Sequence, residues 1–88
     1  RIRLVVMRLI KRIPHDRFLI ELHQYNGKYL LKISLDHYEQ IYKISEDQLK
    51  DTDFFNQLMN APFLKSCLDR FISMRSDFLN ELKQYKNE

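Results

Sequence analysis

The stretch LHQYNGKYL, from Leu22 to Leu30, decides the fold, because it places a strong turn signal between two alternating runs. Asn26-Gly27 is the dipeptide that best fits a two-residue type I′ turn, in which both residues need a positive φ angle. Such a turn sets Tyr25 opposite Lys28, and the rest of the hairpin register follows by counting outward. The further predicted pairs are Gln24 with Tyr29, His23 with Leu30, Leu22 with Leu31, Glu21 with Lys32, Ile20 with Ile33, Leu19 with Ser34 and Phe18 with Leu35.

This register gives the hairpin two different faces, because successive side chains of a strand point to opposite sides of the sheet. One face is apolar and should lie on the core. The other carries the opposite-charge pair Glu21 with Lys32 among scattered apolar residues. The expected core-face residues are Phe18, Ile20, Leu22, Leu31 and Ile33, and the expected second-face residues are Leu19, Tyr25, Leu30 and, from the next strand, Ile41.

A second turn at Asp36-His37 predicts a third strand, from Tyr38 to Ile44. Residues 17–44 would then form a three-stranded antiparallel meander. If the turn is tight, Tyr42 and the two ends of this strand share the core face, whereas a bulge at the turn would reverse the facing of the strand.

Helical signals follow the strands. Ser45 with Gln48 forms a capping box, so a helix should begin at Ser45 within a helical segment over residues 45–60. The run from Asp51 to Asn60 either continues this helix or restarts it, at Asp51 or at Asp53. Its expected buried residues are Phe54, Phe55, Leu58 and Met59.

A long amphipathic helix is predicted over residues 62–86, where apolar residues recur at helical spacing after Pro62. A helix of roughly 22 to 25 residues would be about 33 to 37 Å long, which is more than a three-stranded meander needs as a cover. We therefore expect its C-terminal half to project and to pair with another surface. The predicted stripe is Leu64, Cys67, Leu68, Phe71, Met74, Phe78, Leu82 and Tyr85.

The first segment, RIRLVVMRLIKRI over residues 1–13, fits two structures. Its β-branched residues suggest a strand, but Arg8 interrupts the alternation of a strand. At helical spacing its apolar residues gather on one side and its basic residues on the other, so the pattern favours an amphipathic helix. If the segment is a strand instead, the sheet has four strands under the same helical cover.

Together these elements predict an α+β fold, in which C-terminal helices pack on one face of a small antiparallel sheet. The length of 88 residues allows one domain, over residues 1–88. Because the chain begins at Arg1 and not at a methionine, we expect it to be a fragment of a larger chain.

No pattern for catalysis or cofactor binding is present in the sequence. The only glycine is used by the hairpin turn, so no glycine-rich phosphate loop exists. Cys67 lies on the apolar stripe of a helix, where cysteine usually behaves as a small hydrophobe, and the three histidines lack metal-ligand spacing. We expect a non-enzymatic protein with no catalytic residue, cofactor, metal or small-molecule substrate. A single cysteine outside any CxxC pattern is typical of an intracellular compartment, cytoplasmic or nuclear.

The net charge of +3 is concentrated near the N-terminus, where residues 1–17 hold only one acidic residue. This basic segment could be a solvated helix face, contact nucleic-acid phosphates or lie on an anionic membrane surface. The apolar runs are too short for a membrane-spanning helix, and we do not expect a membrane partner.

The favoured function is protein–protein interaction or oligomerisation in a larger intracellular assembly, through burial of apolar stripes that the chain cannot cover alone. The alternative is a nucleic-acid-binding domain. The candidate partner-binding residues are Leu64, Phe71, Phe78, Leu82 and Tyr85 on the last helix and Leu19, Leu30 and Ile41 on the sheet, and the candidate nucleic-acid-binding residues are Arg1, Arg3, Arg8, Lys11, Arg12 and Arg17.

Overall fold

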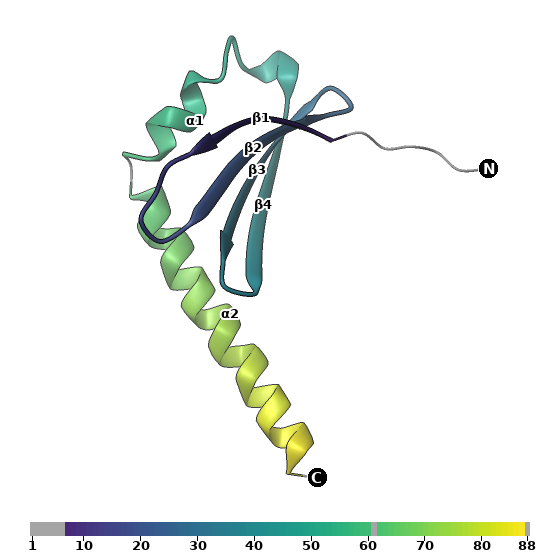
Figure 1. The fold of residues 1–88 in the computed structure, drawn as a ribbon, viewed down its shortest axis with the longest axis vertical. Helices are drawn as coiled ribbons and strands as arrows, with labels where there is room; N and C mark the ends of the chain where they lie inside the picture. The colour runs from purple at the N-terminus through teal and green to yellow at the C-terminus, as the bar shows by residue number, and fades with distance from the viewer. Residues whose placement is uncertain (1–6, 61, 88) are drawn as a thin grey trace, which may run out of the picture.

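A computed structural model describes residues 7–60 and 62–87 of the chain. It has the predicted α+β arrangement, with a four-stranded antiparallel sheet first and a long helix last (Figure 1). The strands lie side by side in the order β1-β2-β3-β4, which is also their order in the chain. The elements are β1 (Arg8–Ile13), β2 (Leu19–Tyr25), β3 (Lys28–Leu35), β4 (Tyr38–Ser45), a 3-10 turn (Glu46–Gln48), α1 (Asp53–Leu58) and α2 (Phe63–Lys86).

The central hairpin of β2 and β3 has the predicted register, from Tyr25 opposite Lys28 to Leu19 opposite Ser34. Asn26 and Gly27 form the turn with φ angles of 53° and 75°, the positive values that a type I′ turn requires. A Cβ atom added at Gly27 would meet nothing within 4 Å, so glycine is favoured here by its φ angle and not by lack of space.

The turn between β3 and β4 is tight, which is the first of the two alternatives predicted for this strand. Tyr38 lies opposite Leu35, and the pairing continues without a bulge to Ser45 opposite Lys28. Asp36 takes a φ angle of 55° in the turn, a left-handed conformation that aspartate tolerates better than most residues. Residues 17–44 therefore form the predicted meander, with the expected core face.

The helix favoured over residues 1–13 is wrong for Arg8–Ile13, which form the strand β1. The pairing of β1 with β2 shifts register between Leu9 and Lys11, so Ile10 is the extra residue of a β-bulge. Ile10 and Ile13 both pack against the core, and their separation of three residues is also the spacing of a helix. The bulge therefore removed the alternation that would have revealed a strand. Residues 1–6 lie outside the described part of the chain.

The capping box predicted at Ser45 does not start an α-helix. The Ser45 hydroxyl donates to the Asp47 carboxylate over 2.7 Å and makes no capping bond to the backbone, and only a 3-10 turn follows. The α-helix restarts at Asp53, which was one of the two predicted restart points. The long helix α2 begins at Phe63, directly after Pro62, and its 24 residues agree with the predicted length.

The core lies between one face of the sheet and the two helices. Phe18, just before β2, packs against Phe71 of α2 with ring centres 5.8 Å apart. Tyr29 of β3 packs edge-on against Phe55 of α1 at 5.6 Å. The buried cluster contains Phe18, Ile20, Leu22, Leu31, Ile33, Phe55, Leu64, Cys67 and Phe71, so all five expected core-face residues of the hairpin belong to it.

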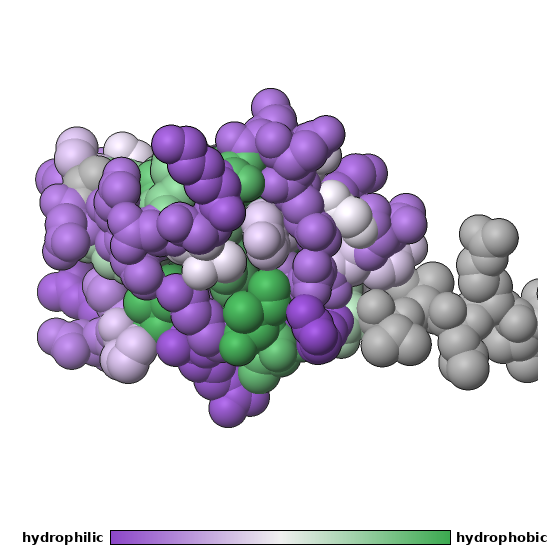
Figure 2. Space-filling model, turned by 90° about the horizontal axis from the view of Figure 1, so that it is seen from above, coloured by the Kyte–Doolittle hydropathy of each residue, from purple (hydrophilic) through white to green (hydrophobic). Residues whose placement is uncertain are grey.

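The end of the molecule that carries α1 is mostly polar on its surface. Viewed from above in Figure 2, polar residues cover much of it and apolar residues show in a few separate groups. Phe54, which we expected to be buried, is 41% exposed on α1, whereas Phe55 beside it lies in the core.

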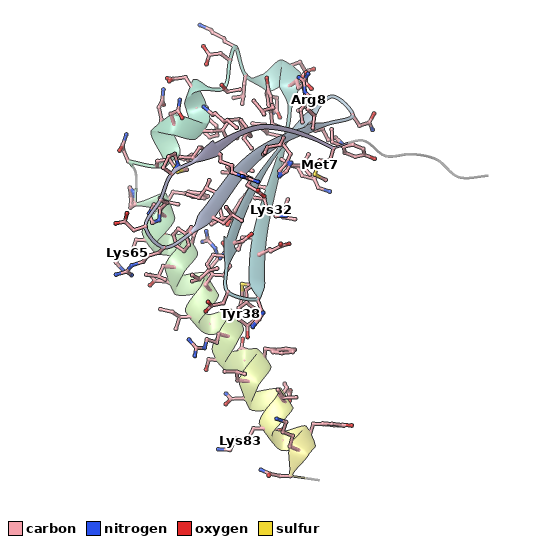
Figure 3. All side chains as sticks on the ribbon, viewed as in Figure 1. Met7, Arg8, Lys32, Tyr38, Lys65 and Lys83 are labelled. Atoms are coloured by element: carbon pink, nitrogen blue, oxygen red, sulfur yellow. The ribbon has the colours of Figure 1, made fainter. Side chains whose placement is uncertain are left out.

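At the other end of the molecule, α2 extends past the sheet (Figure 1). Tyr38, the first residue of β4, packs edge-on against Phe78 of α2 with ring centres 6.3 Å apart. Figure 3 shows Tyr38 at this end of the sheet and Lys83 on the part of the helix beyond it. The last two turns of α2 thus have no sheet beneath them.

Candidate functional site

The projecting part of α2 exposes an apolar surface, which we call the terminal stripe and define as Phe78, Leu82 and Tyr85. The exposed fractions of these residues are 59%, 37% and 74%. They recur at three- and four-residue spacing and so share one side of the helix. Leu79, beside the stripe, is exposed as well. Three of the five partner-binding residues predicted on α2 are therefore brought together on an accessible surface.

The other two predicted residues of this helix, Leu64 and Phe71, lie in the core instead. Phe71 is only 2% exposed, and Leu64 packs in the same buried cluster. Their side chains hold α2 on the sheet and offer no surface to a partner. Helical spacing alone places all five residues on one stripe, and only the end of the sheet separates the covered part from the open part.

The second face of the sheet carries the other three predicted residues, as the hairpin register required. Leu19 and Ile41 are about half exposed, at 50% and 49%, but Leu30 is 6% exposed. Leu30 therefore adds little to a contact surface. Leu19 and Ile41 lie on β2 and β4, with β3 between them.

A cluster of charges surrounds Glu21 on this second face. Its carboxylate accepts from Arg12 Nε at 3.3 Å, lies 3.3 Å from His23 Nε2 and lies 3.8 Å from Lys32 Nζ. Burial by itself would raise the pKa of Glu21, but the bonds to His23 and Arg12 and the positive charge of Lys32 outweigh it. The pKa of Glu21 is therefore lowered from its ordinary value of 4.5.

The lowered pKa of Glu21 predicts a pH-dependent contribution to stability. The ionised carboxylate stabilises the folded chain above the unfolded-state pKa, and this contribution is lost as the pH falls through the lower folded-state value. We expect Glu21→Gln to lower the free energy of unfolding by about 1 to 2 kcal/mol at pH 7. The difference from the unmodified chain should shrink as the pH falls below 4.5.

Urea unfolding midpoints at pH 7 and in the acid range measure this effect. Asp69→Asn is the matched control, because Asp69 is exposed and its one ion pair in the described part of the chain is with Lys65, at 3.3 Å. Its effect should stay near zero at both pH values. An effect of Glu21→Gln that did not change with pH would contradict the assignment.

The described basic residues of the N-terminal region do not share one surface. Lys11 pairs with Leu22 on the helix-covered face and donates to Asn56 of α1 at 3.1 Å, whereas Arg12 is on the opposite face with Glu21. Arg8 donates to Gln24. Arg17 lies in the loop between β1 and β2, past the other end of β1, and Arg1 and Arg3 fall outside the described residues.

A polar cluster between β4 and α2 was not anticipated from the sequence. Gln40, which is buried, donates to the Cys67 carbonyl at 2.9 Å and accepts from the Tyr42 hydroxyl at 2.7 Å and from Arg70 Nε at 3.1 Å. Arg70 also donates to the Tyr42 hydroxyl at 2.9 Å and lies 3.3 Å from the Cys67 sulfur. These bonds fasten the first half of α2 to β4.

The ionisation of Tyr42 responds to this cluster. Burial is the largest cause that raises the pKa of Tyr42, the contact with Cys67 raises it further, and the Arg70 guanidinium lowers it less. The hydroxyl therefore stays protonated and remains a donor to Gln40. The only sequence signals for the cluster were a polar residue on a core-facing strand position and Arg70 three residues after Cys67, and neither identifies its partner.

The histidines, which could in principle bind a metal or act as a base, lie apart from one another. His15 is in the loop after β1, where its Nδ1 accepts from the Arg17 and Phe18 amides, and His37 is in the turn before β4. Within residues 7–60 and 62–87, no three His, Cys, Asp or Glu side chains come together in a way that would hold a metal ion. No helix in this part of the chain is long and apolar enough to cross a membrane.

Comparison with protein-family models, curated proteins and solved structures finds no match for this chain.

Proposed function

We propose that this chain is a non-enzymatic protein-interaction module of a larger intracellular assembly and that the terminal stripe of α2 is its main contact surface. The observation that carries the proposal is the exposure of Phe78, Leu82 and Tyr85 on a helix that extends past its own sheet. An exposed apolar group of this kind, with polar residues around it, is typical of a surface that a partner covers.

The energetics favour association through this stripe. Full burial of a phenylalanine or leucine side chain contributes about 1.5 to 3 kcal/mol, and the exposed parts of Phe78, Leu82 and Tyr85 can contribute a share of this to binding. Phe71 and the Gln40 cluster fasten the first half of α2 to the sheet, and the helix continues without a break to Lys86. The second half is therefore already helical when it binds, which lowers the entropy cost of binding. An apolar groove on a partner is the surface that such a helix fits.

The absence of catalysis is part of the proposal. Cys67 is buried in the core, with Arg70 and Tyr42 as its polar neighbours. Among the described residues, no histidine is hydrogen-bonded to this thiol, which a catalytic cysteine would need as its base.

Photo-cross-linking in cells of the source organism tests the proposed surface. A benzophenone amino acid at position 82 should give one covalent adduct of defined mass, because the terminal stripe is buried against a partner. The same group at position 80, on the opposite side of α2, should give at least about 10-fold less adduct. Tyr85→Glu, combined with the probe at position 82, should reduce the adduct to the level of the control.

Circular dichroism of each variant shows whether the fold is kept. Equal yields from positions 80 and 82, or none from either, would contradict the proposal. A salt-dependent titration with single- and double-stranded oligonucleotides addresses the alternative. Binding that weakens steeply between 50 and 200 mM salt would favour a nucleic-acid-binding domain instead.

A further inference from the structure

The two edges of the sheet differ in how well they are protected against pairing with another chain. β1 has a bulge at Ile10 and three basic residues among its six, and both features discourage edge pairing. β4 has eight residues, contains no proline and pairs with β3 in an unbroken register. The less protected edge is therefore β4.

The backbone groups of β4 that point outward can be identified from its register. The Glu46 amide donates to the Gly27 carbonyl over 3.0 Å, in the pair just beyond the end of the strand. Bonded and non-bonded pairs alternate along an antiparallel ladder. Even-numbered residues of β4 therefore bond to β3, and the N–H and C=O groups of Glu39, Ile41 and Lys43 point away from the sheet. No backbone bond outside the strand ladders, among the described residues, uses these groups.

We propose that β4 pairs antiparallel with β4 of a second copy of the chain, about a two-fold axis at Ile41, so that two sheets join into one. This register makes each outward-pointing residue a bonded partner: Ile41 faces Ile41 of the second copy, and Glu39 faces its Lys43. The two-fold axis repeats the Glu39–Lys43 pair on the other side. Six backbone hydrogen bonds of the usual ladder type would form.

The charges select this register over its neighbours. With the axis at Gln40, Glu39 would lie opposite Ile41, and with the axis at Tyr42, Lys43 would lie opposite it. Both opposite-charge pairs would be lost in either case. Opposite charges placed directly across an antiparallel pair stabilise it, and like charges destabilise it. Only the axis at Ile41 satisfies both charged residues and keeps Ile41 in an apolar pair.

The helical layer adds a groove beside this edge. The groove has a volume of about 450 Å³ and lies between β4 and α2, with Ile41, Ser73 and Met74 among its lining residues. A second copy paired at β4 would lie beside this groove, so these residues would become part of the contact.

The proposed register also gives Phe78 an apolar neighbour. It places Tyr38 opposite Ile44 of the second copy, on the helix-covered face, and Phe78 packs against Tyr38. Ile44 lines an apolar hollow of about 210 Å³ together with Phe54, Leu58 and Phe63. The exposed ring of Phe78 in one copy therefore lies on the same side as the exposed ring of Phe54 in the other copy. The two-fold axis repeats this apolar contact.

This inference rests on the proposed function, because it names a second copy as one partner of the module. Sedimentation velocity of the full 88-residue chain tests it. The unmodified chain should sediment as a dimer at micromolar concentration. Lys43→Glu and Glu39→Lys, each alone, should weaken the dimer by at least about 10-fold, because each change creates two like-charge pairs. An equimolar mixture of the two variants should restore the dimer, because both cross-strand pairs are again of opposite charge.

Lys65→Glu is the matched control, since Lys65 is exposed on α2 and its one ion pair within residues 7–60 and 62–87 is with Asp69. It should leave the dimer unchanged. Failure of the mixture to restore the dimer would overturn the register. A monomer at all concentrations would overturn the pairing with a second copy. The proposed function would then be decided by the cross-linking experiment alone. A dimer that survives both charge reversals but is lost in Leu82→Glu would overturn the β4 contact and support the terminal stripe.

Discussion

Replacing Phe71 with alanine should lower the free energy of unfolding by about 3 to 5 kcal/mol, the usual cost of removing a buried phenylalanine. Phe71 is 2% exposed, and it joins α2 to Phe18 beside the sheet. The substitution removes this contact and leaves a cavity between the two layers. For a chain of this size, each kcal/mol lowers the melting temperature by about 4 to 8 °C, so a fall of more than 10 °C is expected.

Phe78→Ala is the control, because it makes the same change two turns later on the same helix. Phe78 is 59% exposed, and its main contact is the edge of Tyr38. We expect a loss of no more than about 1 kcal/mol. Urea unfolding at one low protein concentration measures both variants. Equal losses would show that the second half of α2 packs as tightly as the first, and this would remove the basis for the terminal stripe.

Replacing Gln40 with alanine should have the second-largest effect, a loss of about 2 to 3 kcal/mol. The substitution removes the three hydrogen bonds that the buried amide makes with the Cys67 carbonyl, the Tyr42 hydroxyl and Arg70. Each bond of this kind contributes about 0.5 to 1.5 kcal/mol to stability. The loss should therefore exceed that of an ordinary surface change several-fold.

Arg70→Ala tests whether the effect comes from the buried amide or from the exposed end of the same cluster. Arg70 lies on the surface of α2, so its removal should cost less than about 1 kcal/mol. Chemical unfolding at pH 7 gives both values, and near-ultraviolet circular dichroism reports the environment of Tyr42. A larger loss for Arg70→Ala than for Gln40→Ala would contradict the role given to the amide.

The meander was predictable because its signals are local. Asn26-Gly27 specifies the turn geometry, and the alternation on both sides then determines the register of β2 and β3. The long helix was predictable for the same reason, since Pro62 and the helical spacing after it lie in one segment.

The errors arose where a distant contact decided the structure. β1 is a strand because it pairs with β2, and the bulge at Ile10 gives its apolar residues a helical spacing. Ser45 satisfies a capping pattern, yet its hydroxyl bonds to Asp47 and the chain turns toward α1 instead. Leu64 and Phe71 were assigned to a partner because the sequence does not show where the sheet ends.

The order of the strands also has a consequence for how the chain reaches its fold. Every strand pairs with its neighbour in sequence, so each step of sheet formation closes only a short loop and costs little chain entropy. Such sheets have local contacts and are of the kind that folds rapidly. The contact of Phe71 with Phe18, by contrast, joins two residues that lie before and after the strands β2 to β4 in the chain. The hairpins are therefore suited to form first, and the arrival of α2 is the late step that commits the chain to its folded state.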